Sequence, residues 1–254
     1  MIGRRSIFGL SLLSVLAFCA LPTQGASAAW ETATNTTAWT CVANGGKKDF
    51  NNPDCSEEVS EGAGAFGHVE IPVGTKTSIE LPSVESSTVT GEILGAKVTI
   101  NCKKTVVDAE SESFIENTTT GGTNMDLHGT SAVIFAECTQ VGNGTNCNIA
   151  GGKTFTLKAV FKGVKEPLAV PSNMAVQFEA DGQPQLATIK FEGSGCLLAE
   201  AKVKGVLRGT VEGAFLTFSS LDQEVTLGGN PATFTSKLTM KMTGGGNPIS
   251  ITTN

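Results

Sequence analysis

The segment Ser131–Lys162 reads SAVIFAEC (131–138), TQVGNGTN (139–146) and CNIAGGKTFTLKAVFK (147–162). Its first and last parts are rich in β-branched and aromatic residues, whereas Gly, Asn and Thr dominate the middle part. This composition is typical of two strands joined by a turn-rich connector. Cys138 and Cys147 stand at the two ends of that connector. The segment therefore predicts part of a β-sheet whose end is tied to other strands by disulfides.

Alternation of apolar and polar residues recurs on both sides of this segment. Upstream, Val98, Ile100 and Cys102 share one face of a short run. Turn clusters separate the runs, and Asp181-Gly182 predicts a hairpin. The last run is the most regular, with an inward face expected to contain Ala232, Phe234, Ser236, Leu238, Met240 and Met242. The pattern predicts an all-β fold, a disulfide-stapled antiparallel β-sandwich or barrel, and leaves the choice between the two open.

The first 28 residues have the pattern of a signal peptide. Arg4 and Arg5 precede an apolar run over Ile7–Leu21, and Ala26-Ser27-Ala28 fits a small-residue cleavage site. The apolar run is short for a membrane helix. We therefore expect a signal peptide at residues 1–28, a mature chain from Ala29 with no membrane span, and a secreted or extracellular location.

Two parts are expected in the mature chain. Residues 29–64 contain two cysteines, Cys41 and Cys55, among turn clusters, and predict a small N-terminal appendage. Residues 65–254 contain the regular alternation and predict the main β-sandwich or barrel domain. The full chain has a formal net charge of −6 at pH 7. An acidic surface disfavours nucleic acid and anionic membranes as partners.

Six cysteines remain once Cys19 is assigned to the signal peptide, which is typical of three disulfides in an exported protein. Cys41–Cys55 would close a short loop. If Cys102 and Cys138 end strands, four cysteines gather at one end of the sheet. Cys102–Cys138 with Cys147–Cys196 is then the preferred pairing, but Cys138–Cys147 with Cys102–Cys196 fits the same argument. The spacings lack the C-x₂-C pattern of zinc sites, so neither a metal nor another cofactor is expected.

Five short motifs carry a resemblance to known proteins. They are HVEIPVGT (68–75), GAKVTINC (95–102), SAVIFAEC (131–138), CNIAGG (147–152) and FEGSGC (191–196). On these motifs the chain resembles uncharacterised exported, β-rich, six-cysteine proteins of soil actinobacteria of the Solirubrobacter type. The resemblance covers most of the mature chain and implies a secreted β fold. It implies no activity, because that group has no assigned function.

Two clusters are the candidates for chemistry. Asp126 and His128 would share one face of a strand, with Ser131 nearby, so an exported hydrolase using these residues is one alternative. Asp108, Glu110 and Glu112 also share a face if residues 106–115 form a strand, and they are the candidate cation ligands. A solvated sheet face accounts for the same pattern, and the three acids lack the Asx-Gly turn of a calcium loop.

The sequence therefore favours a non-catalytic structural or binding module at or near the cell envelope, with an unknown ligand. The Asp126/His128 hydrolase is one alternative. The other is a secreted inhibitor that presents residues 139–146 as a rigid loop between two cysteines.

Overall fold

The computed structural model describes residues 31–32, 36–107, 113–118, 123–127, 133–156, 159–165, 174–180, 182, 184–219 and 223–253. The regular structure in these ranges is β apart from one short 3-10 turn, η1 (Ala150–Gly152), which confirms the predicted all-β class. Within the same ranges no helix is long and apolar enough to cross a membrane. The strands are β1 (Glu31–Thr32), β2 (Thr36–Ala43), β3 (Phe66–Glu70), β4 (Thr77–Glu80), β5 (Ser87–Ile93), β6 (Ala96–Val107), β7 (Phe114–Asn117), β8 (Thr123–Leu127), β9 (Val133–Val141), β10 (Asn148–Ile149), β11 (Lys153–Thr156), β12 (Ala159–Lys165), β13 (Met174–Ala180), β14 (Ala187–Glu192), β15 (Glu200–Glu212), β16 (Phe215–Phe218), β17 (Glu224–Leu227), β18 (Asn230–Thr239), β19 (Lys241–Met242) and β20 (Ile249–Thr253).

Most of these strands form two closed rings. The first ring runs β5–β6–β9–β11–β14–β15–β17–β18 and returns to β5, and every pair in it is antiparallel. The second runs β4–β7–β8–β12–β13–β15–β16–β18 and returns to β4 through β19. A separate small sheet lies beside the second ring, which we therefore call the proximal half. We call the first ring the distal half.

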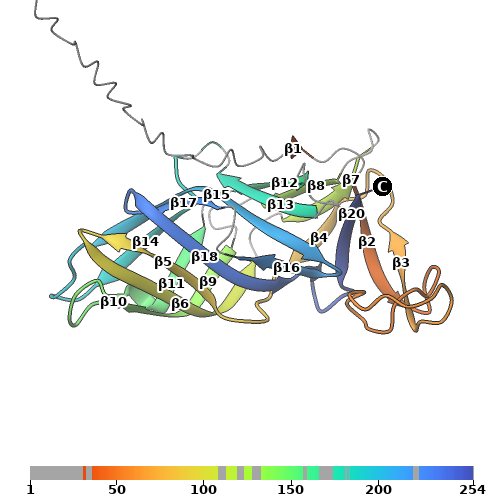
Figure 1. Ribbon diagram of the computed structural model, residues 1–254, viewed down its shortest axis with the longest axis horizontal. Coiled ribbons are helices and arrows are strands. Elements are labelled where there is room, and N and C mark those ends of the chain that lie inside the picture. Colours follow the sequence, from red (N-terminus) through yellow and green to blue (C-terminus); the bar gives the residue numbers. More distant parts are fainter. Residues whose placement is uncertain are drawn as a thin grey trace, which may run out of the picture.

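The two rings are the two halves of one elongated barrel (Figure 1). Each run of chain passes through both halves, for example β4 then β5, or β16 then β17, and pairs with the next run along the chain. The last run, β18 with β19, pairs with the first, so the barrel is an up-and-down antiparallel one. The hairpin predicted at Asp181-Gly182 is wrong, because β13 and β14 both pair with β15 and are successive pieces of one barrel strand.

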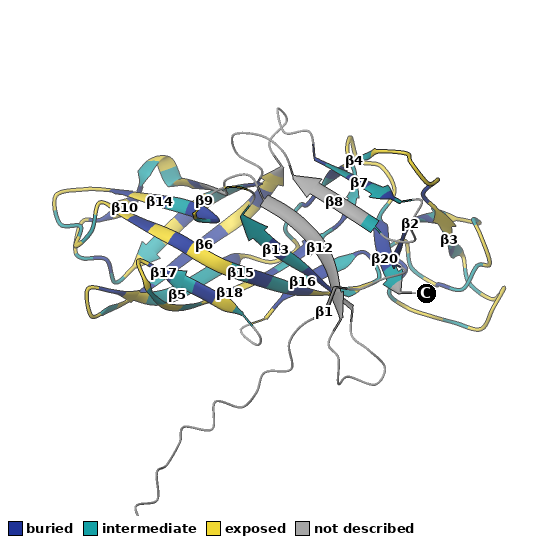
Figure 2. Cartoon of the chain, turned by 90° about the horizontal axis from the view of Figure 1, so that it is seen from above, coloured by how far each residue is buried: buried dark blue, intermediate teal, exposed yellow. Residues whose placement is uncertain are grey.

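Alternating side chains fill the barrel. Buried and exposed residues alternate along β6 and β15 in Figure 2. In β18, Phe234, Ser236 and Leu238 are buried, as the sequence predicts, whereas Thr233 and Thr235 are exposed. Burial of these apolar side chains, at roughly 25 cal/mol per Å² of apolar area, is the main favourable contribution to the stability of the barrel.

The alternation of inward and outward side chains along β6 and β9 is interrupted where the two halves of the barrel meet. Cys102 and Cys138 are directly opposite each other and buried, and the next opposed inward pair is Thr105 with Phe135. Two residues separate the inward positions on each strand, instead of one. On the outer face Glu137, which has a φ of 53°, forms an ion pair with Lys104. The hydrogen bond from Lys104 and its charge lower the pKa of Glu137. We call this level of the barrel the waist.

A three-stranded sheet, β20–β2–β3, covers the proximal end of the barrel. Ala38, Ile71 and Ile249 of this part of the chain are at most 2% exposed and belong to the same apolar core as the barrel interior. The sheet takes β3 and β20 from the region expected to form the main domain, so it crosses the expected boundary at residue 65. Residues 36–43 therefore form the central strand of a sheet that is completed by β3 and β20.

Asn117, the last residue of β7, joins the small sheet to the barrel. Its Oδ1 accepts hydrogen bonds from the Ala38 amide (2.7 Å) and the Thr123 hydroxyl (3.0 Å). Its Nδ2 donates to the carbonyl oxygens of Ala38 (3.0 Å) and Ile71 (2.7 Å). The residue is 2% exposed. The Ala38 carbonyl also accepts from the Ile71 amide (3.1 Å), whereas the Ala38 amide and the Ile71 carbonyl take their hydrogen bonds here from Asn117.

Replacing Asn117 with alanine is expected to lower the free energy of unfolding by about 2–3 kcal/mol, because it leaves buried backbone groups unpaired. Urea titration of the oxidised protein measures this loss. The matched control is Asn230→Ala, since Asn230 makes one exposed hydrogen bond to the Glu92 carbonyl (3.0 Å) and its loss should change stability by no more than about 0.5 kcal/mol. Equal losses for the two variants would contradict the role assigned to Asn117.

The structure contains three disulfides, Cys41–Cys55, Cys102–Cys138 and Cys147–Cys196. Of the two arrangements that the sequence leaves open for the last four cysteines, it forms the preferred one. The expected position of Cys102 and Cys138 at strand ends is wrong, because both lie inside their strands and cross-link neighbours near the waist. Only Cys147–Cys196 lies at the distal end, where it joins the β9–β10 and β14–β15 loops.

Candidate functional site

The distal half of the barrel contains a cavity of ≈ 50 Å³ near the waist. An eight-stranded barrel is just wide enough to be filled by side chains or to hold one small ligand. Each strand contributes to the cavity wall residues that are two positions apart in the sequence, such as Ser87 and Val89 of β5 or Ala187 and Ile189 of β14. The larger apolar side chains of the wall are Val89, Ile100, Phe135, Leu186, Ile189, Val203, Leu207 and Phe234.

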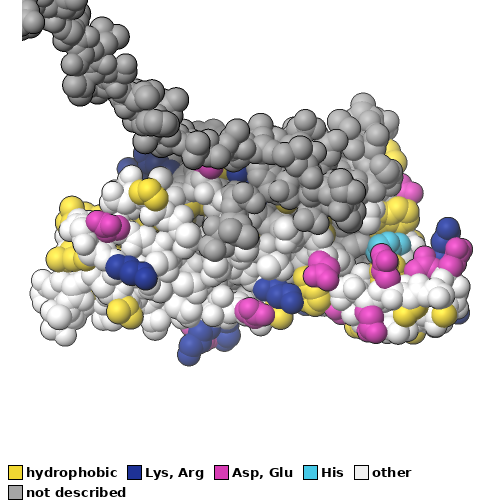
Figure 3. All heavy atoms as spheres, viewed as in Figure 1, with side chains coloured by type: hydrophobic (Ala, Val, Ile, Leu, Met, Phe, Trp, Pro, Cys, Tyr) yellow, Lys and Arg dark blue, Asp and Glu magenta, His cyan; other side chains and the backbone are white. Residues whose placement is uncertain are grey.

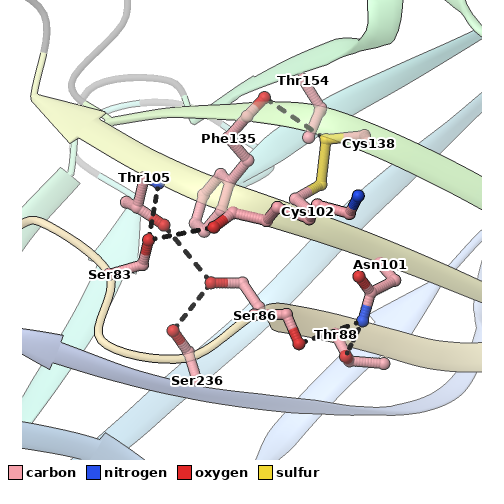
Figure 4. The surroundings of a disulfide bond; sticks show 12 residues. Ser83, Ser86, Thr88, Asn101, Cys102, Thr105, Phe135, Cys138, Thr154 and Ser236 are labelled. Carbon is pink, nitrogen blue, oxygen red and sulfur yellow. Dashed lines mark hydrogen bonds between the residues drawn. A yellow bond between two sulfur atoms is a disulfide. The ribbon is translucent and has the colours of Figure 1, made fainter.

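Three buried hydroxyls form a hydrogen-bonded chain near the Cys102–Cys138 disulfide, and Figure 4 labels two of them, Thr105 and Ser236. Ser87, which lines the cavity, has its Oγ 2.7 Å from the Ser236 Oγ and 3.3 Å from the Thr105 Oγ1. The three residues are 2%, 5% and 4% exposed, respectively. Buried hydroxyls are stable only when they are hydrogen-bonded, so the three stabilise one another inside an apolar wall.

Phe135 and Val89 are the two partly buried apolar residues of the wall. The Phe135 ring packs edge-to-face on Phe234 with the ring centroids 6.0 Å apart. Phe234 in turn packs on Phe218 (5.2 Å), and Phe218 on Phe178 (5.4 Å). This row of rings runs from the cavity into the proximal half. Phe234 makes edge contacts on two sides, with Phe135 and with Phe218, and these contacts hold its ring in the wall.

The distal end of the barrel is closed by two loops that are held together. Asn143, in the β9–β10 loop, is fully buried, and its side chain accepts a hydrogen bond from the Leu198 amide (3.2 Å) and donates one to the Leu198 carbonyl (3.1 Å). The Gln140 side chain accepts from the Asn143 amide (3.0 Å). The Cys147–Cys196 disulfide joins the same two loops, so the connector 139–146 is anchored to the barrel at several points.

A second polar group lies in the small sheet, where His68 is half-buried between two rings. Its ring centroid is 5.6 Å from that of Trp39 and 4.6 Å from that of Phe50. Its Nε2 is 3.0 Å from the Ser250 Oγ. A serine beside a histidine is the geometry of an activated nucleophile, but Ser250 is 2% exposed and leaves no room for a substrate. Figure 3 shows the histidine among acidic side chains at this end of the molecule.

Burial lowers the pKa of His68 from its ordinary value of 6.5, and the negative charges of Asp49 and Glu58 partly oppose that shift. The folded protein therefore binds the His68 proton more weakly than the unfolded chain does. The contribution of this pKa difference to the free energy of unfolding is fully present above pH 6.5, and it is lost as the pH falls through the lowered pKa.

We expect His68→Gln, which keeps a hydrogen-bonding group but does not titrate, to remove this component of the acid sensitivity. Unfolding free energies of both proteins, measured from pH 8 down to pH 5, give the test. The carboxylates and His128 are common to both proteins, so their titration cancels in the difference. A pH-independent difference between the two would contradict the assignment of this sensitivity to His68.

Of the candidate catalytic and cation-binding residues that the sequence predicts, only Asp126 lies in the described part of the chain. Asp126 lies in β8, opposite Phe114 of β7 and Val160 of β12 in the ladder. His128, Ser131 and the acidic stripe Asp108, Glu110 and Glu112 lie outside the described residues. Among the described residues, no group of three His, Cys, Asp or Glu side chains is placed to hold a metal ion.

Sequence reasoning missed the residues that surround the cavity. Ser87 and Thr105 belong to runs of Ser, Thr and Val whose alternation is weak, and nothing local shows that they meet Ser236 from β18. The only available signal was Ser236 itself, a polar residue on the otherwise apolar inward face of the most regular strand.

Comparison of the chain with protein-family models, curated proteins and solved structures gives no significant match.

Proposed function

We propose that the protein is an exported, non-catalytic binding module that works at or near the cell envelope and holds a small apolar molecule in the distal half of its barrel. The observation that carries the proposal is the closed barrel with a cavity whose accessible wall is almost entirely apolar. Such a wall is suited to binding an apolar molecule rather than to proton transfer, because apolar contacts supply affinity and no titratable side chain lines the cavity among the described residues.

The proposed location rests on the signal-peptide pattern and on the disulfides. Disulfides persist in oxidising compartments, and three of them cross-link the described part of this chain. The envelope association is tested by adding the oxidised protein to envelopes of the cells that produce it. Saturable co-sedimentation supports the association, and a protein that remains in the supernatant overturns it.

Xenon tests the ligand site, since dry apolar protein cavities bind it. Under xenon pressure, NMR should show shifts of the Ile100, Ile189 and Leu207 methyl signals, which line the cavity. Ala187→Leu fills the cavity from β14 and should abolish these shifts, and Val203→Ile is a smaller filling variant in case the first does not fold. Unshifted cavity methyls in the wild-type protein would overturn the ligand site.

A second candidate function is a secreted inhibitor that presents the 139–146 connector. The observation that favours it is that this connector is anchored through Asn143 and exposes its residue Val141, which is 74% exposed. Val141→Asp should then abolish inhibition of the secreted proteases in the producing culture and leave the xenon shifts unchanged. Without inhibition by the wild-type protein, this candidate fails.

A further inference from the structure

The outer face of the distal half carries two rows of uncharged side chains across the neighbouring strands β18, β5, β6 and β9. Phe234, Val89 and Ile100, which lie between the two rows on the first three strands, line the interior cavity, so the rows themselves point outward. Directly opposed residues make up each row, Thr233, Thr90, Thr99 and Val141 towards the distal end, and Thr235, Thr88, Asn101 and Thr139 towards the waist. We call these eight residues the threonine face.

The threonine face contains no charged residue, although charges are common on the opposite side of the distal ring. There, Lys190 of β14 and Lys202 and Lys204 of β15 are exposed. High strand propensity accounts for threonine in any single strand, but it does not account for the lack of lysine and glutamate at eight outward positions of four strands. Such a face loses no charge hydration when an uncharged partner covers it.

Several side chains of the threonine face are held in place by one another. The Thr90 Oγ1 is 3.3 Å from the Thr99 Oγ1, and the Asn101 Nδ2 donates a hydrogen bond to the Thr88 Oγ1 (3.0 Å; Figure 4). Threonine is also stiff at χ1, because its β-carbon is branched. These partly exposed hydroxyls keep further lone pairs and protons for a ligand. The face therefore presents ordered donors and acceptors, and binding costs little side-chain entropy.

An open depression of ≈ 380 Å³ adjoins the distal row of the threonine face. Its wall includes Thr90 and Thr233 of that row, together with Pro231, Glu92 and Lys97. Glu92 and Lys97 are directly opposite each other in the β5–β6 ladder. A carboxylate accepts hydrogen bonds from ligand hydroxyls and an ammonium group donates them, while their opposite charges cancel. The depression is several times larger than the interior cavity of ≈ 50 Å³.

The spacing of the two rows indicates the shape of the ligand. Neighbouring strands lie about 4.8 Å apart, so a row extends for about 14 Å from β18 to β9, and the rows lie about 7 Å apart along the strands. Each threonine offers a methyl group beside its hydroxyl. A matching ligand is extended and uncharged, and its hydroxyls alternate with C–H groups, as in a carbohydrate chain. An aliphatic partner would leave the hydroxyls without hydrogen bonds, and an anionic polymer would find no cluster of basic residues on this face.

We propose that the threonine face and the depression beside it bind a neutral polysaccharide chain of the cell envelope. The inference rests on the proposed envelope association and gives it a molecular target, and it is independent of the interior cavity. The threonine and asparagine side chains hydrogen-bond the sugar hydroxyls, and the threonine methyl groups and Val141 contact the sugar C–H groups. The eight residues include no aromatic ring on which a sugar stacks, so the affinity comes from many weak contacts and increases with the length of the chain.

The probe that tests this site is a set of neutral oligosaccharides from the envelopes of the producing cells, released by partial acid hydrolysis and freed of charged fragments by ion exchange. Titrated into the oxidised protein, they should shift the NMR amide signals of Thr88, Thr99 and Thr233 in a saturable way. Long fragments should reach half-saturation at a lower sugar concentration than short ones. Periodate, which cleaves the vicinal diols of sugars, should abolish the shifts. Signals of the threonine face that stay unshifted throughout the titration would overturn the proposal.

The double variant Thr90→Val/Thr233→Val removes two hydroxyls beside the depression and keeps the side-chain shape and the strand propensity. It should raise the half-saturation concentration about tenfold to a hundredfold, because each neutral hydrogen bond contributes about threefold to tenfold. The matched control is Thr210→Val, the same substitution at an exposed threonine of β15 outside the face, which should leave half-saturation unchanged. Equal or tighter binding by the double variant would show that apolar contact holds the ligand, and would overturn the proposal.

The outcomes separate this inference from the proposed function. If whole envelopes retain the protein but the neutral oligosaccharides leave the threonine face unshifted, the envelope association stands and the polysaccharide site fails. The envelope partner is then of another class, such as a protein. If the oligosaccharides bind the face but whole envelopes do not retain the protein, the polysaccharide site stands and the association fails. The xenon test is unaffected by either result, because the threonine face points away from the cavity.

Discussion

Replacing Gly205 with alanine is expected to lower the free energy of unfolding by about 4 kcal/mol, one of the two largest effects that we anticipate. Gly205 lies in β15 opposite Val225 of β17, with a φ of 107°, a conformation that L-residues rarely adopt. A Cβ at this position would be 1.7 Å from the Glu224 carbonyl oxygen. Because that atom belongs to the backbone of the neighbouring strand, the ladder itself must move to make room.

Gly229→Ala is the matched control for this variant. Gly229 also has a left-handed φ, 95°, but its Cβ would have no neighbour within 4 Å. Its substitution should cost about 1–2 kcal/mol, the strain of the backbone alone. Urea titration of both variants therefore separates the close approach of β15 and β17 from conformational strain. Equal losses would show that the two strands do not approach each other at Gly205 as described.

The local alternation of the strands could be predicted from the sequence. The alternating run 232–242 became β18 and β19, with Phe234, Leu238 and Met240 buried as expected. The same alternation predicts that the strand ends at Cys102, because Lys103 and Lys104 are two consecutive polar residues. The structure continues β6 to Val107 by changing phase together with β9. A phase change shared by two strands has no signature in either strand alone.

Closure of the barrel could not be predicted, because it depends on pairings between distant segments. β18 joins β5, and β20 joins β2, across most of the length of the chain. Alternation shows which side of a strand is apolar, but a sandwich and a barrel require the same alternation. The cavity is still less predictable. It exists because Ala187 and Ser87 are small at positions where larger residues would fill the interior, which only the assembled wall shows.

Loss of the Cys147–Cys196 disulfide is the second large effect. The double variant Cys147→Ala/Cys196→Ala should lower the free energy of unfolding by about 4 kcal/mol in the chain-entropy model, since the two cysteines are 49 residues apart. The Asn143 side chain joins the same two loops through Leu198, so the folded distal end should keep its arrangement. The loss then arises mainly from the greater freedom of the unfolded chain.

Two measurements test this account. Removing Cys41–Cys55, whose cysteines are 14 residues apart, should cost about 3 kcal/mol on the same model, so the difference between the two double variants is about 1 kcal/mol. Adding Asn143→Ala to the Cys147→Ala/Cys196→Ala variant removes the remaining connection between the loops. Amide exchange at β10 and at the end of β14 should then accelerate far more than in either parent, because these residues pair with each other beneath the loops. If the disulfide variant alone already exchanges as fast as the combined variant, the disulfide rather than Asn143 closes the distal end, and its loss acts on the folded state.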